Sequence, residues 1–256
     1  MNHGKINDSN VYIYRFANLF GPNYNSVVAT WCHNIACGKD IQINDPDVKI
    51  PLCYIDDVID EVINCIGGNA NLTSEGYYGV KTIHTIDLGS LAAIIQGFKS
   101  SRQNLQIPSM KKNSLEKKLY STYLSYLPEN EFSYPLKMNI DERGSFTEFV
   151  KTNDYGQVSV NISKPGITKG EHWHHSKNEK FLVVSGNGLI QLRNIYSDEI
   201  VEYNVNGNRL EVIDIPTGYT HNIINTGSVD MITIMWANET FDPQKPDTYF
   251  EKVVKD

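Results

Sequence analysis

Hydrophobic and polar positions change their spacing near the middle of the chain. In the first half, apolar residues recur at helical spacing in four segments that short polar or glycine-containing turns separate. Gly38 and Gly67 follow two of these segments, where glycine commonly ends a helix. Helices are therefore expected at residues 26–37, 56–66, 88–102 and 115–127, and short strands at residues 11–14, 41–43 and 82–86. This alternation of helices and strands predicts an α/β unit.

Beyond Lys137 the chain changes to short runs of alternating apolar and polar residues, separated by turn residues. Strands are expected at residues 147–151, 156–162, 179–184, 188–193, 200–205, 210–213, 221–225 and 231–236. About eight such strands are typical of a β-sandwich or barrel. The connection at residues 128–135 contains Ser, Asn and Pro. The pattern therefore predicts a two-domain α+β protein with domains at residues 1–127 and 128–256.

Composition limits the partners of this 256-residue chain. Its formal net charge of −7 and its longest basic run, Lys111 and Lys112, argue against nucleic-acid binding and against electrostatic membrane docking. No apolar stretch approaches the roughly 20 residues that span a bilayer. The 4 cysteines have no CxxC spacing and follow no secretory leader, so reduced thiols in a cytoplasmic protein are expected. A small-molecule substrate or a protein partner remains.

The most informative polar residues lie in the second half. His172 and His174 are two positions apart, so in a strand their side chains share a face, whereas His175 points away. Glu179 follows after a short turn, and His221 arrives on a later strand. Three imidazoles and a carboxylate suit zinc, nickel, iron(II) or manganese and leave positions for a substrate oxygen or water. A lone histidine is more often a surface or packing residue, but one metal ion would satisfy all four groups together.

This spacing resembles the cupin superfamily. The first cupin motif, G-x5-H-x-H-x4-E-x6-G, is matched by Gly166, His172, His174, Glu179 and Gly186. The second, P-x-G-x2-H-x3-N, is matched by Pro216, Gly218, His221 and Asn225, after a gap that is longer than in the family pattern. The resemblance implies a metal-binding cupin domain, which is a β-barrel of the double-stranded β-helix or jelly-roll type. Its implied metal ligands are His172, His174, Glu179 and His221.

Cupin barrels host oxygenases, isomerases, epimerases and binding modules, so the fold leaves the reaction open. Residues 141–148 are similar to the D-x-R-G-x-F-x-E entry of epimerases that act on 4-keto nucleotide sugars, although those enzymes generally work without a metal. This entry disfavours a dioxygenase. A ketone at C4 makes the C3 proton acidic, so a base and an acid are needed. The candidate catalytic residues are His174, His175, Lys180 and Tyr219, and the sequence does not rank them.

Both halves together resemble the CapF family of bifunctional capsular-polysaccharide enzymes, in which a short-chain dehydrogenase domain is joined to a zinc cupin. The resemblance is carried by residues 15–21, 23–26, 54–58, 120–127 and nearly the whole cupin. It implies C3 epimerisation of a UDP-4-keto-6-deoxy-N-acetylhexosamine in the cupin, followed by NADPH reduction at C4. It further implies Zn²⁺ as the metal, a UDP-sugar substrate, a homodimer formed through the cupin, and a role in N-acetyl-L-fucosamine precursor synthesis.

A reductase of this family needs a glycine-rich turn and a Tyr-x-x-x-Lys pair, and neither precedes Arg15. Residues 1–127 are therefore expected to be the substrate lobe of an extended short-chain dehydrogenase without its Rossmann half. For Arg15, Asn18, Tyr54 and Asp56, structural roles are favoured over substrate contacts. NADP(H) binding and reductase activity are not expected. Two hypotheses remain: a metal-dependent 3-epimerase, and a catalytically inactive gene remnant that folds and binds metal.

Overall fold

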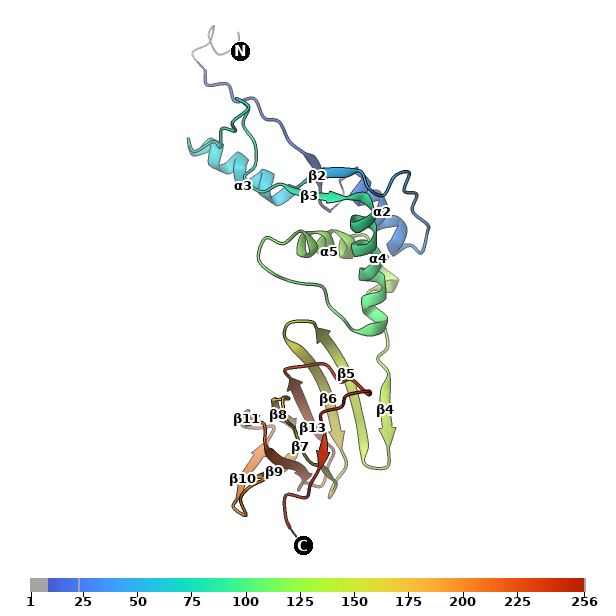
Figure 1. Cartoon of the computed structure of the whole chain (residues 1–256), viewed down its shortest axis with the longest axis vertical. Coiled ribbons are helices and arrows are strands. Elements are labelled where there is room, and N and C mark those ends of the chain that lie inside the picture. The colour runs from blue at the N-terminus through green and yellow to red at the C-terminus, as the bar shows by residue number, and fades with distance from the viewer. Residues whose placement is uncertain (1–8, 23, 256) are drawn as a thin grey trace. The chain divides into compact units, whose positions relative to one another are not determined.

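The structure, a computed structural model, describes residues 9–22 and 24–255, and the chain divides into two compact units. Described residues up to 103, together with 108–133, form the first unit, and residues 104–107 and 134–255 form the second. Figure 1 shows long helices in the first unit and a strand-built body in the second. The sheets are mostly antiparallel, which confirms the predicted α+β class. The assignment of the first unit to a dehydrogenase lobe stays a prediction.

Among the residues that the structure describes, the first unit combines a small sheet with four helices. Its sheet has the order β1 (Asn18–Phe20), β2 (Lys49–Tyr54) and β3 (His84–Asp87), with β1 parallel and β3 antiparallel to β2. The helices are α2 (Val27–Ala36), α3 (Ile55–Ile66), α4 (Leu88–Asn104) and α5 (Leu115–Ser125), with a 3₁₀ turn η1 (Glu129–Glu131) after them. Ser26 caps α2 and Ser114 caps α5 through side-chain oxygens that accept backbone N–H groups, as these residue types favour.

Two strand predictions in the first unit are wrong. Residues 41–43 form a loop, in which Ile41 and Ile43 pack against the helical core without a strand to pair with. Residues 11–14 contribute only an isolated bridge from Tyr14 to Tyr78, and a regular strand forms further on, at β1. Ile41 and Ile43 are thus used for packing, whereas Val11, Tyr12 and Ile13 are exposed, and an apolar run alone does not distinguish either case from β pairing.

The second unit consists of two antiparallel sheets that form a jelly roll. Its strands are β4 (Met138–Asp141), β5 (Gly144–Thr152), β6 (Gly156–Ser163), β7 (Thr168–Trp173), β8 (Glu179–Ser185), β9 (Asn187–Asn194), β10 (Ile200–Asn206), β11 (Val212–Ile215), β12 (Tyr219–Asn225), β13 (Met231–Ala237) and β14 (Tyr249–Phe250). The sheet orders are β10-β9-β12-β7-β14 and β11-β8-β13-β6-β5-β4. The eight expected strands all form with slightly shifted ends, whereas β4 and β14 were not anticipated and β7 was assumed only in placing His172 and His174 on one strand face.

The core of this unit places the sheets around the candidate site. Buried apolar side chains from both sheets pack together, among them Phe181, Ile190, Ile215, Ile223 and Met231. Because strand residues alternate between the two faces of a sheet, the same inward-facing rows that fill this core also supply polar groups nearby. The barrel therefore fixes those polar groups on a packed scaffold.

In the part of the chain that the structure describes, no helix has both the length and the apolar character needed to cross a membrane.

Candidate metal centre

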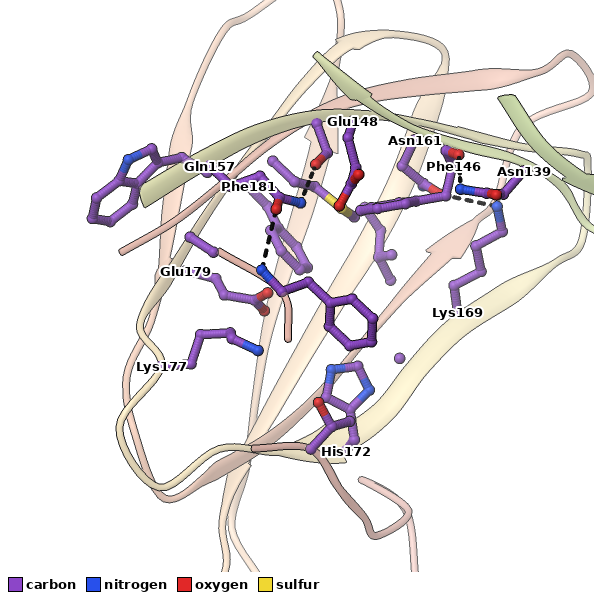
Figure 2. Close-up of a pocket in the computed structure, with 18 of the residues that line it drawn as sticks. Asn139, Phe146, Glu148, Gln157, Asn161, Lys169, His172, Lys177, Glu179 and Phe181 are labelled. Carbon is purple, nitrogen blue, oxygen red and sulfur yellow. Dashed lines mark hydrogen bonds between the residues drawn. The ribbon is translucent and has the colours of Figure 1, made fainter. Parts of the chain in front are cut away.

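The barrel contains a cavity of about 830 Å³, lined by residues of both sheets. This volume is in the range of small-molecule binding sites. Figure 2 shows Glu148, Lys169 and Lys177 around the cavity, together with His172 and Glu179. The lining also includes the apolar residues Phe146, Phe181, Ile223 and Met235 and the charged residues Asp141, Arg143 and Glu239. The cavity thus combines apolar walls with groups that carry charge or protons.

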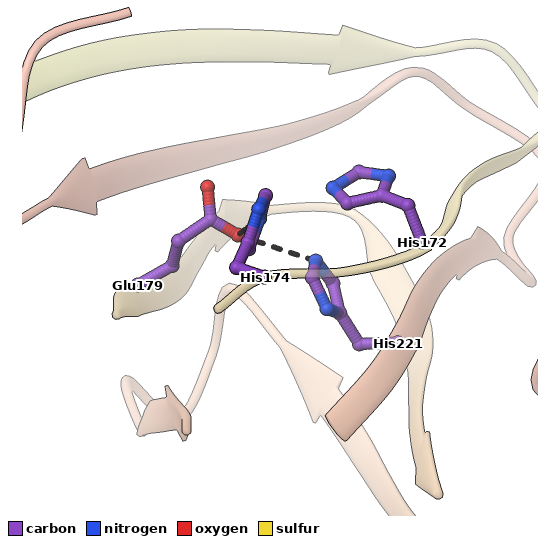
Figure 3. A group of neighbouring side chains, drawn as sticks. All are labelled: His172, His174, Glu179 and His221. Atoms are coloured by element: carbon purple, nitrogen blue, oxygen red, sulfur yellow. Dashed lines mark ion pairs between the residues drawn. The ribbon is translucent and has the colours of Figure 1, made fainter. Parts of the chain in front are cut away.

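All four expected ligands line this cavity and lie together. His172 is near the end of β7, His174 follows that strand, Glu179 begins β8, and His221 lies on β12 in register with His172. One ligand atom from each lies within 4.8 Å of the others. Figure 3 shows the Glu179 carboxylate directed toward the rings of His174 and His221, with His172 beside them.

The donor atoms fit a divalent cation. Nε2 of His174 lies 3.4 Å, and Nε2 of His221 3.2 Å, from the same Glu179 oxygen. All three atoms are buried and have no hydrogen-bond partner among the described residues. The other ring nitrogen, Nδ1, contacts a backbone carbonyl in both histidines, that of Asp247 for His174 and that of Tyr219 for His221. A proton on each Nδ1 leaves each Nε2 lone pair free for a metal ion.

The electrostatics of the cluster follow from burial and mutual contact. Burial, with His221 and His174 nearby, lowers the pKa of His172 to about 4. Burial alone would also lower the pKa of His174, but the contact with Glu179 outweighs it and leaves that pKa raised. Although burial disfavours its charged form, the contacts with His174 and His221 hold the pKa of Glu179 well below its usual range. The cluster therefore presents a carboxylate and a neutral His172 imidazole, both suited to a cation.

Among the expected catalytic residues, only His174 lines the cavity. The exposed ring of His175 lies against Trp173 and Tyr249, at centroid distances of 4.6 and 5.0 Å. Lys180 forms an exposed ion pair with Asp214. Tyr219 is half-buried and packs against the barrel core. The catalytic assignment of these residues stays a prediction that the cavity geometry does not favour.

Lys169 and Glu148 are cavity residues that the sequence analysis missed. The Lys169 ammonium donates to Asn161 Oδ1 at 2.9 Å, to the Ile162 carbonyl at 2.8 Å and to the Ser145 carbonyl at 3.4 Å. Burial lowers the pKa of Lys169. Strict alternation along β7 would place positions 169 and 172 on opposite faces of the sheet, so Lys169 was not expected to line the same cavity as His172. Glu148 could have been identified from the sequence, because it is the last residue of the D-x-R-G-x-F-x-E motif at residues 141–148.

Two antiparallel sheets around a cavity with three histidines and one glutamate define the class: a cupin-type barrel with a candidate metal site. Residues 139–249 match the family model described as polysaccharide biosynthesis C-terminal domain. The crystal structure of capsular polysaccharide assembling protein CapF from Staphylococcus aureus is 55% identical, with a TM-score of 0.91 over 98% of this chain and 69% of that one. The chain belongs to the CapF family of polysaccharide biosynthesis proteins.

Two further relatives extend the comparison. A crystal structure of CapF with the inhibitor 3-isopropenyl-tropolone is also 55% identical, with a TM-score of 0.92 over 98% of this chain and 74% of that one. UDP-2-acetamido-2,6-beta-L-arabino-hexul-4-ose reductase from Pseudomonas aeruginosa is 44% identical over 243 residues, which is 93% of this chain. The chain spans 64% of the length of that curated relative.

Proposed function

We propose that the barrel catalyses metal-dependent epimerisation at C3 of a UDP-4-keto-6-deoxy-N-acetylhexosamine, in capsular-polysaccharide precursor synthesis, with zinc as the metal. The observation that carries the proposal is the group of three buried, unpartnered donor atoms on His174, Glu179 and His221 at the wall of the cavity. Such atoms are costly unless a ligand satisfies them, and three imidazoles with a carboxylate are a common zinc donor set. The cavity wall beside them offers the space for a substrate.

The substrate class is suggested by the Pseudomonas relative, which is named for a UDP-linked 4-keto sugar. A UDP-sugar carries a negatively charged diphosphate and a polar ring, and the cationic Arg143, Lys169 and Lys177 all line the cavity. The apolar Phe146 and Phe181 offer surfaces for a sugar ring and its 6-methyl group. This mixture of groups suits a nucleotide sugar better than an apolar ligand.

The reaction needs proton transfer on both faces of the sugar ring at C3. A bound divalent ion supplies Lewis-acid polarisation of the C4 carbonyl, which acidifies the neighbouring C3 proton. Among the cavity groups able to hold a proton, we assign the acid and base roles to Lys169, at Nζ, and Glu148, at its carboxylate. The Glu148 carboxylate, the proposed base, lies 2.9 Å from the Lys151 ammonium. The Lys169 ammonium is the corresponding acid.

CapF has been crystallised with a tropolone inhibitor, which is a ligand type that a metal-dependent enzyme would bind. A tropolone carries a carbonyl and a hydroxyl oxygen on adjacent ring carbons, an arrangement that chelates divalent cations through two oxygens. Vicinal oxygens of this kind also resemble the C3 and C4 oxygens of a keto sugar.

The test is NMR of the 4-keto UDP-sugar in deuterated buffer with purified, metal-analysed protein. We expect loss of the C3 proton signal, abolished by chelation and by His221→Ala, because proton abstraction at C3 exchanges that proton with solvent. His33→Ala, an exposed histidine in the first unit, is the matched control and should exchange as the unsubstituted chain does. Absence of exchange despite about one bound zinc per chain would contradict the proposal and favour an inactive remnant.

A further inference from the structure

Residues 246–253 form a strap that contacts both histidine-bearing strands. Within the strap, β14 pairs with β7 so that Phe250 lies opposite His172 and Tyr249 opposite Trp173. The Thr220 hydroxyl, next to His221 on β12, donates to the Glu251 carbonyl. The strap thus touches the immediate neighbours of two proposed metal ligands.

His174 lies beyond the last residue of β7, so the regular strand ladder does not hold it. The loop that follows is fastened by Asp247 instead. One carboxylate oxygen of Asp247 accepts the backbone N–H of His175 at 2.9 Å. The other accepts the N–H groups of Ser176 at 2.9 Å and Lys177 at 3.0 Å and the Ser176 hydroxyl at 3.1 Å.

The same residue contacts the His174 ring. The Asp247 carbonyl accepts from Nδ1 of His174, which directs Nε2 toward Glu179 and His221. Asp247 has a φ of +42°, in the left-handed region that only glycine, asparagine and aspartate adopt readily. Lys177 Nζ also donates a hydrogen bond, at 3.0 Å, to the carbonyl of Pro246, the residue before Asp247. Backbone strain of this kind persists only where surrounding contacts enforce it.

A second carboxylate ties the far end of the strap to the other two histidines. Glu171 precedes His172, has a φ of +61°, and accepts from Asn222 Nδ2 at 2.9 Å and from the Val253 N–H at 2.6 Å. Asn222 is the direct neighbour of His221. The buried Arg193 guanidinium holds the strap from the other side through the Val253 carbonyl at 2.8 Å.

We propose that the strap, through Asp247, is a positioning device that presets the His174 ring for metal binding; this inference rests on the proposed metal-dependent function. Asp247 acts through His174 and does not itself reach the metal. Its carboxylate fixes the path of the 174–177 loop, and its carbonyl fixes the ring nitrogen that carries the proton. Groups that orient a ligand in this way typically change metal affinity 10- to 100-fold when removed.

The test compares metal binding by the full chain and by Asp247→Gly and Asp247→Asn. Glycine tolerates the positive φ but removes the whole carboxylate, whereas asparagine tolerates it and keeps one acceptor oxygen. We expect the dissociation constant for Zn²⁺, from chelator competition, to rise 10- to 100-fold in Asp247→Gly and less in Asp247→Asn. The visible absorption bands of the Co²⁺-loaded Asp247→Gly protein should also change, because they report ligand geometry.

Asn206→Gly is the matched control. Its side chain likewise accepts two backbone N–H groups, of Asn208 at 3.0 Å and Arg209 at 3.1 Å, in a turn of the same barrel outside the cavity. This variant should lose thermal stability and keep both the Zn²⁺ affinity and the Co²⁺ spectrum. Unchanged Zn²⁺ affinity and spectrum in Asp247→Gly would overturn the inference alone. Failure of the unsubstituted chain to bind Zn²⁺ would overturn the metal assignment and the inference with it.

Discussion

In the candidate metal centre, three buried atoms lack a hydrogen-bond partner among the described residues: Nε2 of His174, Nε2 of His221 and Oε2 of Glu179. Each buried polar atom without a partner costs on the order of 1–3 kcal/mol. A cation would remove this cost at all three atoms at once, because the ligand atoms lie within 4.8 Å of one another. Loss of one ligand should therefore weaken metal binding strongly. Loss of a neighbouring histidine that is not a ligand should not.

Alanine substitutions of the adjacent residues His174 and His175 test the assigned set of metal ligands. His174→Ala should weaken Zn²⁺ binding by more than the 10- to 100-fold typical of residues that only orient a ligand, because it removes a donor atom. His175→Ala should leave Zn²⁺ binding within a few-fold of the unsubstituted chain, because its exposed ring contacts Trp173 and Tyr249 outside the cavity. Chelator competition measures both, and equal losses in the two variants would contradict the assigned ligand set.

Lys169 separates proton transfer from metal binding. Lys169→Met removes the ammonium and keeps the length of the side chain, so C3 proton exchange should fall on the order of 100-fold or more. Metal content should stay at about one ion per chain, since Lys169 is not a proposed ligand. Circular dichroism checks folding, because Asn161 Oδ1 and the Ile162 carbonyl lose a donor. Undiminished exchange by a folded, metal-loaded variant would exclude Lys169 as the acid.

At the scale of single elements, β7 and β12 owe their irregular geometry to Gly170. Gly170 has a φ of +105°, and a Cβ there would lie 2.7 Å from the His221 carbonyl oxygen and 2.9 Å from Asn222 Cα. The pairing of β12 with β7 shifts register at this point, between His221 and Asn222. The close approach of the two backbones therefore sets where His221 enters the cavity.

Gly170→Ala should destabilise the barrel by about 3 kcal/mol, since it adds backbone strain and a contact with backbone atoms that cannot move aside cheaply. Gly166→Ala is the matched control: its φ is +75°, but a Cβ there meets nothing within 4 Å. Strain alone should cost this variant about 1–2 kcal/mol. Urea denaturation of both variants measures the difference, and equal losses would show that the β7–β12 contact is not limiting.

Local pattern predicted the long helices and most barrel strands because helical and alternating periodicity persists over many residues in each. The four expected ligands also lie together, because motif spacing captures strands that pair at a fixed register. The sequence pattern failed to predict side-chain positions that depend on contacts between residues far apart in the sequence. Lys169 lines the cavity although strict alternation along β7 would place it on the other face from His172. Gly170 and Glu171, which lie between them, have positive φ values that break this alternation. His174 depends on Asp247, which no local signal links to it.

At the scale of the whole molecule, the two units have separate buried cores. Phe20, Leu52, Leu91 and Leu119 belong to the core of the first unit, and the candidate metal centre lies entirely in the second. A ligand that binds only the folded state stabilises the part of the structure that carries its site. Stability of the two units should therefore respond differently to metal.

Calorimetry of the full chain tests this. At free Zn²⁺ a thousandfold above its dissociation constant, linkage adds about 4 kcal/mol to the barrel, which for a domain of this size raises its unfolding temperature by roughly 10 °C or more. The unfolding temperature of the first unit should be the same with Zn²⁺ as with a chelator. His221→Ala, at the same Zn²⁺ concentration, should show no shift in either transition. A Zn²⁺-dependent shift of the first unit's transition that persists in His221→Ala would mean that zinc binds outside the barrel, and would contradict a centre confined to His172, His174, Glu179 and His221.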